Sequence, residues 1–324
     1  MGVRAAPRSA RVALSRVGLE GVDTVIRLGA DQRSAQPFPA RLECHVELDP
    51  ERQDACASRF DEVVLDAVRD VVVGGAEIRA ERLAQAVAAR VRERQRARRA
   101  EVAIAARFPE RRPAPVSGTP TQEISTLHAR AVASERATRW TIGVSAQGMT
   151  ASPHAQGVLA ARARERLAAG GFSEARIARA LALVPVATHD QLGVGTLHLG
   201  CPEDCVLEFD VAALLAVVEG AMSSDIFELM KRSDEAAVVE RAHRRPRFVD
   251  DCVRAMLADV VERFADLPDA AFVSAAQEST ETTHGHHLTA ERSGSLGELR
   301  RELRTGEPVA RQTSMRQWLE ADGR

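Results

Sequence analysis

Two acids and three histidines fall within the twelve residues QESTETTHGHHL, from Gln277 to Leu288. Carboxylates and imidazoles are ligands that Zn²⁺, Fe²⁺ and Mn²⁺ accept. On a strand, His284 and His286 would point to one face. Glu281 would reach the same metal only if the backbone turned, which Gly285 permits. Taken alone, the stretch leaves two interpretations open, a metal site or a solvated polar loop.

Other polar residues with possible chemistry lie upstream of this stretch. They are His154 in SPHAQ, His189 in ATHDQ, Lys231, Arg232 and Glu235 in LMKRSDE, and Asp250 in RFVDD. Each has an ordinary structural explanation when taken alone. A lone histidine is usually a loop or core residue, and acids at a helix start complement the macrodipole. None of these residues indicates a site without the others.

Composition narrows the class of protein. Hydrophobic residues make up 45% of the 324 positions and charged residues 28%, which is typical of a globular protein with a real core. The net charge is −2, so no global field favours nucleic acid or an anionic membrane as a partner. Arginine is abundant and Lys231 is the only lysine, so arginine content is weak evidence for phosphate binding.

The sequence also lacks the signals of a membrane or secreted protein. No stretch approaches the roughly 20 apolar residues that span a bilayer, and the N-terminus has no continuous apolar region of a signal peptide. Five scattered cysteines do not resemble a disulfide framework, so we interpret Cys201 and Cys205 as ordinary thiols. We therefore expect a cytoplasmic protein.

Hydrophobic periodicity predicts the elements that must position these residues. In the first half, strands are expected over 11–28, 38–48 and on both sides of a loop at 113–120, with helices over 58–75 and 80–99. In the second half, strands are expected over 139–149, 195–201, 205–211 and 269–280, and helices over 155–171, 212–232, 248–264 and 295–303. The order predicts an α+β protein of two modules, residues 1–138 and 139–324.

Four segments in a fixed order show a family resemblance. GMTASPHAQ, ATHDQ, LMKRSDEAAVVERAHRRPRFVDD and ESTETTHGH occur at about the spacing found in the type IB GTP cyclohydrolases. The chain resembles the archaeal methanopterin-pathway branch more than the bacterial folate-pathway branch. The resemblance implies the tunnelling fold (T-fold), with two tandem modules of antiparallel sheet backed by helices. It also implies a homo-oligomer, a dimer or tetramer, with active sites at subunit interfaces.

The resemblance implies a reaction and a cofactor. Family members are hydrolases that open the imidazole ring of GTP at C8, release formate and form 7,8-dihydroneopterin triphosphate or its cyclic phosphate. The implied cofactor is one divalent metal per site, Fe²⁺, Zn²⁺ or Mn²⁺, which generates a nucleophile from water. GTP or a related purine nucleotide is the implied partner.

The resemblance also assigns residues to roles. The metal ligands it implies are His189, Glu235, Glu281 and His284. Ser152 stands at a family cysteine that is a ligand or catalytic thiol, and a serine hydroxyl is a much poorer ligand. His154 replaces a second cysteine of that turn and could complete the metal coordination in a catalytic role.

The remaining assignments concern proton transfer and substrate. His286 matches a possible proton carrier, and Cys56 stands where the family has a histidine. Asp250 stands where a glutamate anchors the guanine edge, since a carboxylate can accept two N–H donors. By position, Lys231, Arg232 and Arg59 are the expected triphosphate contacts.

Three functions remain open from the sequence. The first is a cyclohydrolase acting on GTP, favoured because the four ligands occur together. The second is a pathway-specific member that acts on GTP or a related purine, which the changes at Cys56, Ser152 and His154 would explain. The third is a non-catalytic homologue that binds a purine or pterin. Turnover separates the third from the others.

Overall fold

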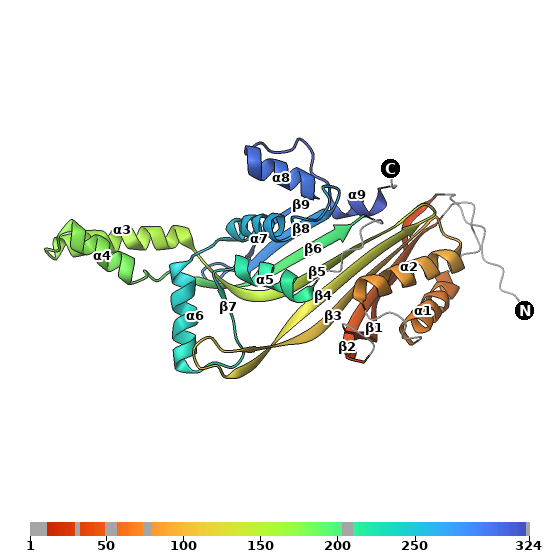
Figure 1. The fold of residues 1–324 in the computed structure, drawn as a ribbon, viewed down its shortest axis with the longest axis horizontal. Helices are drawn as coiled ribbons and strands as arrows, with labels where there is room; N and C mark the ends of the chain where they lie inside the picture. Colours follow the sequence, from red (N-terminus) through yellow and green to blue (C-terminus); the bar gives the residue numbers. More distant parts are fainter. Residues whose placement is uncertain (1–11, 30–32, 49–56, 74–78, 203–209, 322–324) are drawn as a thin grey trace, which may run out of the picture.

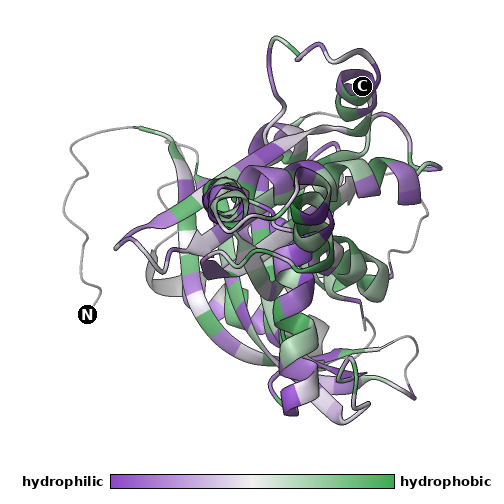
Figure 2. Cartoon of the chain, turned by 90° about the vertical axis from the view of Figure 1, so that its left-hand side faces the viewer, coloured by the Kyte–Doolittle hydropathy of each residue, from purple (hydrophilic) through white to green (hydrophobic). Residues whose placement is uncertain are grey.

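Long antiparallel strands form wherever apolar and polar residues alternate. The computed structural model describes residues 12–29, 33–48, 57–73, 79–202 and 210–321 (Figure 1). The strands are β1 (Leu14–Leu28), β2 (Gln36–Leu48), β3 (Arg99–Pro113), β4 (Pro120–Ser134), β5 (Thr138–Ala151), β6 (Asp190–Cys201), β7 (Ser224–Asp225), β8 (Phe272–Thr280) and β9 (His287–Ser295). Figure 2 shows hydrophobic and hydrophilic residues alternating along them, as half-buried strands require.

The helices connect strand pairs in both halves of the chain. They are α1 (Ala57–Val73), α2 (Ala80–Gln95), α3 (Pro153–Ala169), α4 (Glu174–Leu183), α5 (Val211–Ala221), α6 (Arg232–Arg244), α7 (Val249–Arg263), α8 (Leu296–Thr305) and α9 (Met315–Glu320). The predicted order of two strands, two helices and two strands is confirmed in the first half. The sequence interpretation did not include α4, β7, β9 or α9.

All described strands belong to one sheet. Its order is β1-β2-β3-β4-β5-β6-β8-β9, with each strand antiparallel to its neighbours, and β7 pairs antiparallel with β5. The boundary expected at residue 138 falls at the first residue of β5, where the sheet continues without a break from β4. The division into two modules therefore stays a prediction.

One face of the sheet carries the core. Leu83 and Val87 of α2 and Leu214 and Val218 of α5 are buried in a single apolar cluster with β-strand residues from both halves, such as Ile142. The spacing of four residues within each helix places these side chains on one stripe. Burying each such side chain contributes about 1.5–3 kcal/mol, so the shared core holds the two halves together.

The opposite face of the sheet is polar at its centre. His128 of β4, Gly143 of β5 and His198 of β6 lie in one row across three strands. A Cβ on Gly143 would lie 2.3 Å from His198 Nδ1, so the glycine leaves the space in which the two imidazoles approach, with ring centroids 5.4 Å apart. Ser145 Oγ lies 2.8 Å from both His128 Nε2 and Thr196 Oγ1.

The helix predicted over 212–232 is wrong beyond its first half. Helix α5 ends at Ala221, and the chain then adds β7 to the edge of β5. Ser223 N–H donates to Met149 O at 2.9 Å, and Ser223 Oγ accepts from Ala151 N and from Arg247 N. These contacts with β5 and with Arg247 compensate for the helical hydrogen bonds that the segment gives up. The strand predicted over 205–211 lies mostly outside the described residues.

Strands β4 and β5 diverge where β7 enters. They pair from Thr138 to Ser145 of β5, and beyond that point β5 pairs with β7. The segment after β7 turns back to β4, because Glu228 N–H donates to Glu123 Oε1 at 3.0 Å. A fork therefore opens between β4 and β5 at the end of the sheet that carries most of the conspicuous motifs.

Helices α3 and α4 form a hairpin that extends away from the sheet (Figure 1). Helix α3 has no buried residue, and Ile177 is the buried residue of α4. The base of the hairpin is held by Gln156, whose Nε2 donates to Val186 O and His243 O at 2.7 Å each. The hairpin connects Ser152 to His189, so its base lies at the predicted site.

Two further observations concern the expected compartment and cysteines. Among the residues that the structure describes, no helix is long and apolar enough to cross a membrane. Cys201, expected to be an ordinary thiol, is disulfide-bonded, whereas Cys44 and Cys252 are free. Cys205 lies outside the described residues.

Candidate active site

Three of the predicted residues come together because neighbouring antiparallel strands end at the same edge of the sheet. Ser152 follows the last residue of β5, and His189 precedes the first residue of β6. Ala151 pairs with Asp190 across these strands. Glu281 follows β8, whose last residue Thr280 pairs with Leu192 of β6.

Gln191 links His189 to Glu281. Its Nε2 lies 2.8 Å from His189 Nδ1 and donates to Glu281 Oε2 at 3.2 Å. Gln191 is 3% exposed and Glu281 is 8% exposed. Glu281 Oε1 is buried and has no hydrogen-bond partner among the residues that the structure describes. A buried carboxylate oxygen without a partner is unfavourable, so the pair suits a cation.

The hydroxyl of Ser152 is used to cap the start of helix α3. Its hydroxyl accepts a hydrogen bond from Ala155 N at 3.3 Å, as an N-cap serine does. Its N–H donates to His189 O at 3.3 Å, and its carbonyl accepts from Thr188 Oγ1 at 3.0 Å. Ser152 therefore holds the two strand ends together. His154 lies exposed in the first turn of α3.

His284 and His286 lie in an exposed loop and not on a strand, so the two-face pattern considered for a strand does not apply. His284 and His286 stack on each other, with ring centroids 5.0 Å apart and an interplanar angle of 15°. His287 begins β9, and its Nδ1 lies 3.2 Å from Thr280 Oγ1. The described residues contain no group of three or more His, Cys, Asp or Glu side chains arranged as a metal site.

Two adjacent acids at the start of α6, Asp234 and Glu235, differ in burial. Glu235 is exposed, as are Lys231 and Arg232, whereas Asp234 is fully buried. Asp234 accepts hydrogen bonds from Val116 N, from Ser117 N and Oγ, and from Lys231 N, at 2.7–2.9 Å. Burial alone would raise the pKa of Asp234, but these donors favour the charged form and hold the pKa well below its usual range.

The other predicted residues either lie apart from the pair formed by His189 and Glu281 or fall outside the residues that the structure describes. Asp250 lies in the first turn of α7 and forms an ion pair with Arg254. Arg59 lies in α1, with its side chain outside the description, and Cys56 lies outside the described residues. Sequence reasoning missed Gln191 and Asp234, although both occur inside the motifs HDQ and KRSDE. Their roles depend on contacts between segments far apart in the chain, which no local pattern records.

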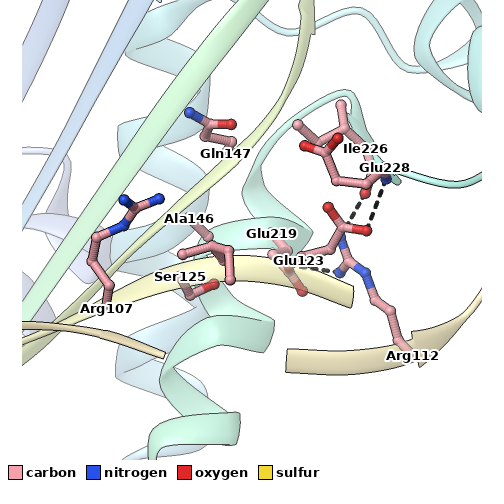
Figure 3. Close-up of a pocket in the computed structure, with 10 residues that line it drawn as sticks. Arg107, Arg112, Glu123, Ser125, Ala146, Gln147, Glu219, Ile226 and Glu228 are labelled. Atoms are coloured by element: carbon pink, nitrogen blue, oxygen red, sulfur yellow. Dashed lines mark hydrogen bonds and ion pairs between the residues drawn. The ribbon is translucent and has the colours of Figure 1, made fainter. Parts of the chain in front are cut away.

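A polar cavity of about 150 Å³ occupies the fork between β4 and β5 (Figure 3). Arg112 donates from Nη1 to Glu219 at 2.6 Å and from Nη2 to Ile226 O at 2.7 Å. Burial raises the pKa of Glu219 to about 7, against the opposing effect of Arg112. Arg107 and Gln147 line the other side of the cavity. No sequence pattern predicted this cavity, because the fork forms only where β7 enters.

The chain matches a protein-family model over residues 2–290, and the model describes the GCHY-1 family, type I GTP cyclohydrolase folE2. The chain belongs to the type I GTP cyclohydrolase folE2 family. The GTP cyclohydrolase MptA of Methanoregula boonei is 36% identical over 306 residues, covering 93% of each chain. The GTP cyclohydrolase MptA of Methanoculleus marisnigri is 34% identical over 91% of this chain and 95% of its own. The predicted family resemblance is confirmed.

A solved structure confirms the fold of this GTP cyclohydrolase family member. Uricase from Arthrobacter globiformis superposes with a TM-score of 0.51 at 9% identity, covering 93% of this chain and 98% of its own. At that identity the likeness concerns the fold alone. It agrees with the α+β tunnelling fold that we predict, an antiparallel sheet backed by helices.

Proposed function

We propose that this chain is a metal-dependent GTP cyclohydrolase that opens the imidazole ring of GTP at C8 and releases formate. The product would be 7,8-dihydroneopterin triphosphate or its cyclic phosphate. Family membership supports the reaction class, and relatives named GTP cyclohydrolase MptA support GTP as substrate. The observation that carries the proposal is the unpartnered Oε1 of Glu281 beside His189.

His189 and Glu281 would hold the metal, because an imidazole and a carboxylate suit Fe²⁺, Zn²⁺ and Mn²⁺. When bound, the metal supplies the Lewis acidity that makes water a nucleophile near neutral pH. Glu235, His284 and His154 are the proposed further ligands. They are exposed in one protomer, so a second copy that covers this edge can bring them to the pair.

The substrate contacts follow from exposed charge near the same edge. Asp250 lies at the start of α7, and its carboxylate can accept N–H donors from a guanine edge after exchanging its ion pair with Arg254. Lys231 and Arg232 at the start of α6 are free to contact phosphates. His286 lies in the loop after Glu281, within the same motif, and is the proposed proton carrier.

The test is anaerobic incubation of purified protein, reconstituted with Fe²⁺, Mn²⁺ or Zn²⁺, with GTP. We expect formate release and, after oxidation, pterin fluorescence, with anion-exchange chromatography separating a triphosphate from a cyclic phosphate. Bound metal without formate would exclude the proposal. That outcome would favour a related purine substrate or a binding homologue, since Ser152 replaces the family cysteine and serves as a helix cap.

A further inference from the structure

We infer that Gln191 is the positioning residue of the candidate metal site, and this inference rests on the metal dependence proposed above. Gln191 would not bind the metal or substrate itself. It sets the separation and orientation of His189 and Glu281 before a cation arrives. The amide nitrogen has two hydrogens, and one contact uses each of them, at 2.8 Å to His189 Nδ1 and 3.2 Å to Glu281 Oε2.

The contacts with Gln191 determine which atoms of both partners can bind a cation. While Nδ1 of His189 accepts from the amide, the proton of the neutral imidazole lies on Nε2. On Glu281, Oε2 is occupied, and the buried Oε1 has no partner within the described part of the chain. Because the same nitrogen of Gln191 contacts both groups, the distance between His189 Nδ1 and Glu281 Oε2 cannot exceed the sum of the two contact distances. Glu281 thus keeps one oxygen available for a cation, and His189 offers the lone pair of Nε2 when the amide of Gln191 turns so that its oxygen accepts from Nδ1–H.

The far end of the amide is anchored to two other strands. Thr150 Oγ1 of β5 lies 3.4 Å from Gln191 Oε1 and 3.0 Å from Ser279 Oγ of β8. Thr150 and Ser279 are each 2% exposed. Hydroxyls can donate or accept, so this anchor also tolerates a turned amide that accepts from Nδ1–H. A buried and anchored amide loses little entropy on binding, and partners of this kind typically change metal affinity by 10–100-fold.

The sequence offers a matched control in Gln277. This second buried glutamine, 1% exposed, lies on β8 of the same sheet. Its amide donates to Glu278 O at 3.2 Å and makes no described contact with His189 or Glu281. Replacing either glutamine by methionine removes a buried amide at similar volume. The two variants therefore share the general effect on the sheet and differ at the metal site.

The experiment measures Mn²⁺ and Zn²⁺ affinity of wild type, Gln191→Met and Gln277→Met by calorimetry, with metal content after dialysis as a second readout. We expect Gln191→Met to bind about 10–100-fold more weakly than Gln277→Met, at similar thermal stability of the metal-free proteins. Equal affinities would overturn the inference. If Gln191→Met does not fold, Thr150→Val tests the same anchor and should weaken metal binding less.

The two proposals fail in different ways. Wild-type protein that binds metal but releases no formate from GTP would contradict the proposed function and leave the role of Gln191 intact. An active, metal-containing wild type with an unaffected Gln191→Met variant would contradict the role of Gln191 alone. Wild-type protein that binds neither metal would overturn both.

Discussion

At the scale of single residues, neighbouring positions in this chain have different roles that their chemistry alone does not separate. Asp234 and Glu235 are both carboxylates in the first turn of α6. Asp234 is buried under four hydrogen bonds and ties the turn after β3 to α6, whereas Glu235 is exposed. One acid therefore belongs to the fold and the other is available for the site.

Substituting these two acids should give opposite results. Asp234→Asn should lower the thermal unfolding midpoint by several degrees, because an amide cannot accept all the donors that face it. Glu235→Gln should leave the midpoint unchanged and reduce metal content and GTP turnover. Calorimetry and metal analysis of both variants check this. A stable Asp234→Asn variant, or a Glu235→Gln variant with normal metal content, would contradict the respective half.

His154 provides a second test at this scale. Ser152 uses its hydroxyl as a helix cap, so we expect the exposed His154 to supply the missing ligand. His154→Ala should reduce metal affinity and GTP turnover by at least about tenfold without changing thermal stability. Unchanged metal content and activity would exclude His154 from the site. Val158→Ala, another exposed position of α3, is the control.

The histidine pair on the polar sheet face predicts a pH dependence of stability. Burial lowers the pKa of His198 to about 3, with contributions from His128 and Arg130, and burial with Arg130 lowers the pKa of His128 to about 4. Because both pKa values are lowered on folding, the unfolded chain binds protons first. The stabilisation is therefore present above pH about 6.5 and is lost as the pH falls toward 4.

Replacing one histidine should flatten that dependence. His198→Gln should lose stability less steeply than wild type between pH 6.5 and 4, by up to about 1.4 kcal/mol per pH unit. Urea unfolding at several pH values measures the slopes. The raised pKa of Glu219 changes stability with pH in the opposite direction. Because Glu219 is present in both proteins, its contribution cancels in the difference between the two slopes. Identical slopes would show that His198 titrates normally.

At the scale of elements, the structure predicts that the α3–α4 hairpin and the sheet are separate units of stability. The hairpin contributes Ile177 as its buried side chain, and this residue lies outside the main apolar cluster. Its base is nevertheless tied to α6 through Gln156 and His243 O. A loosened hairpin would therefore leave the sheet folded while disturbing the connection between Ser152 and His189.

Ile177→Ala should open the hairpin locally. We expect faster amide hydrogen exchange over 153–183 and an unchanged global unfolding transition, because few buried contacts hold this unit. Hydrogen-exchange mass spectrometry measures the first effect and calorimetry the second. The exposed Val158 again provides a control, since Val158→Ala should exchange as wild type does. Uniformly faster exchange throughout the sheet would contradict the separation of the two units.

At the scale of the whole molecule, the candidate site is incomplete in one protomer. His189 and Glu281 are joined through Gln191, while Glu235, His284 and His154 are exposed. A homo-oligomer with sites at subunit interfaces would account for this arrangement, as the sequence resemblance implies. The oligomer stays a prediction.

Mixing two inactive variants tests a shared site. If His189 and Glu235 of one site come from different protomers, His189→Asn and Glu235→Gln proteins should each be inactive. Unfolded and refolded together, they should recover roughly a quarter of wild-type turnover, because in a random dimer mixture half the dimers contain one intact site. Light scattering gives the subunit count. A monomer, or no recovery in mixed oligomers, would contradict a shared site.

The sequence by itself determined the fold class and most of the strands and helices, because hydrophobic period follows local backbone geometry. Ordered motifs also predicted the family, and the resemblance they carry predicts His189 and Glu281 as metal ligands. The hydrophobic pattern predicted the wrong structure over part of 212–232. There the helix ends early, because β5 offers hydrogen bonds to Ser223 and β7.

The tertiary structure alone decided which of these residues meet. Strand register brings the ends of β5, β6 and β8 to one edge, and only there does Gln191 lie between His189 and Glu281. It also decided that Asp234 is buried and Glu235 exposed. The physical reason is that burial and hydrogen-bond partners come from segments far apart in the chain, which no local spacing encodes.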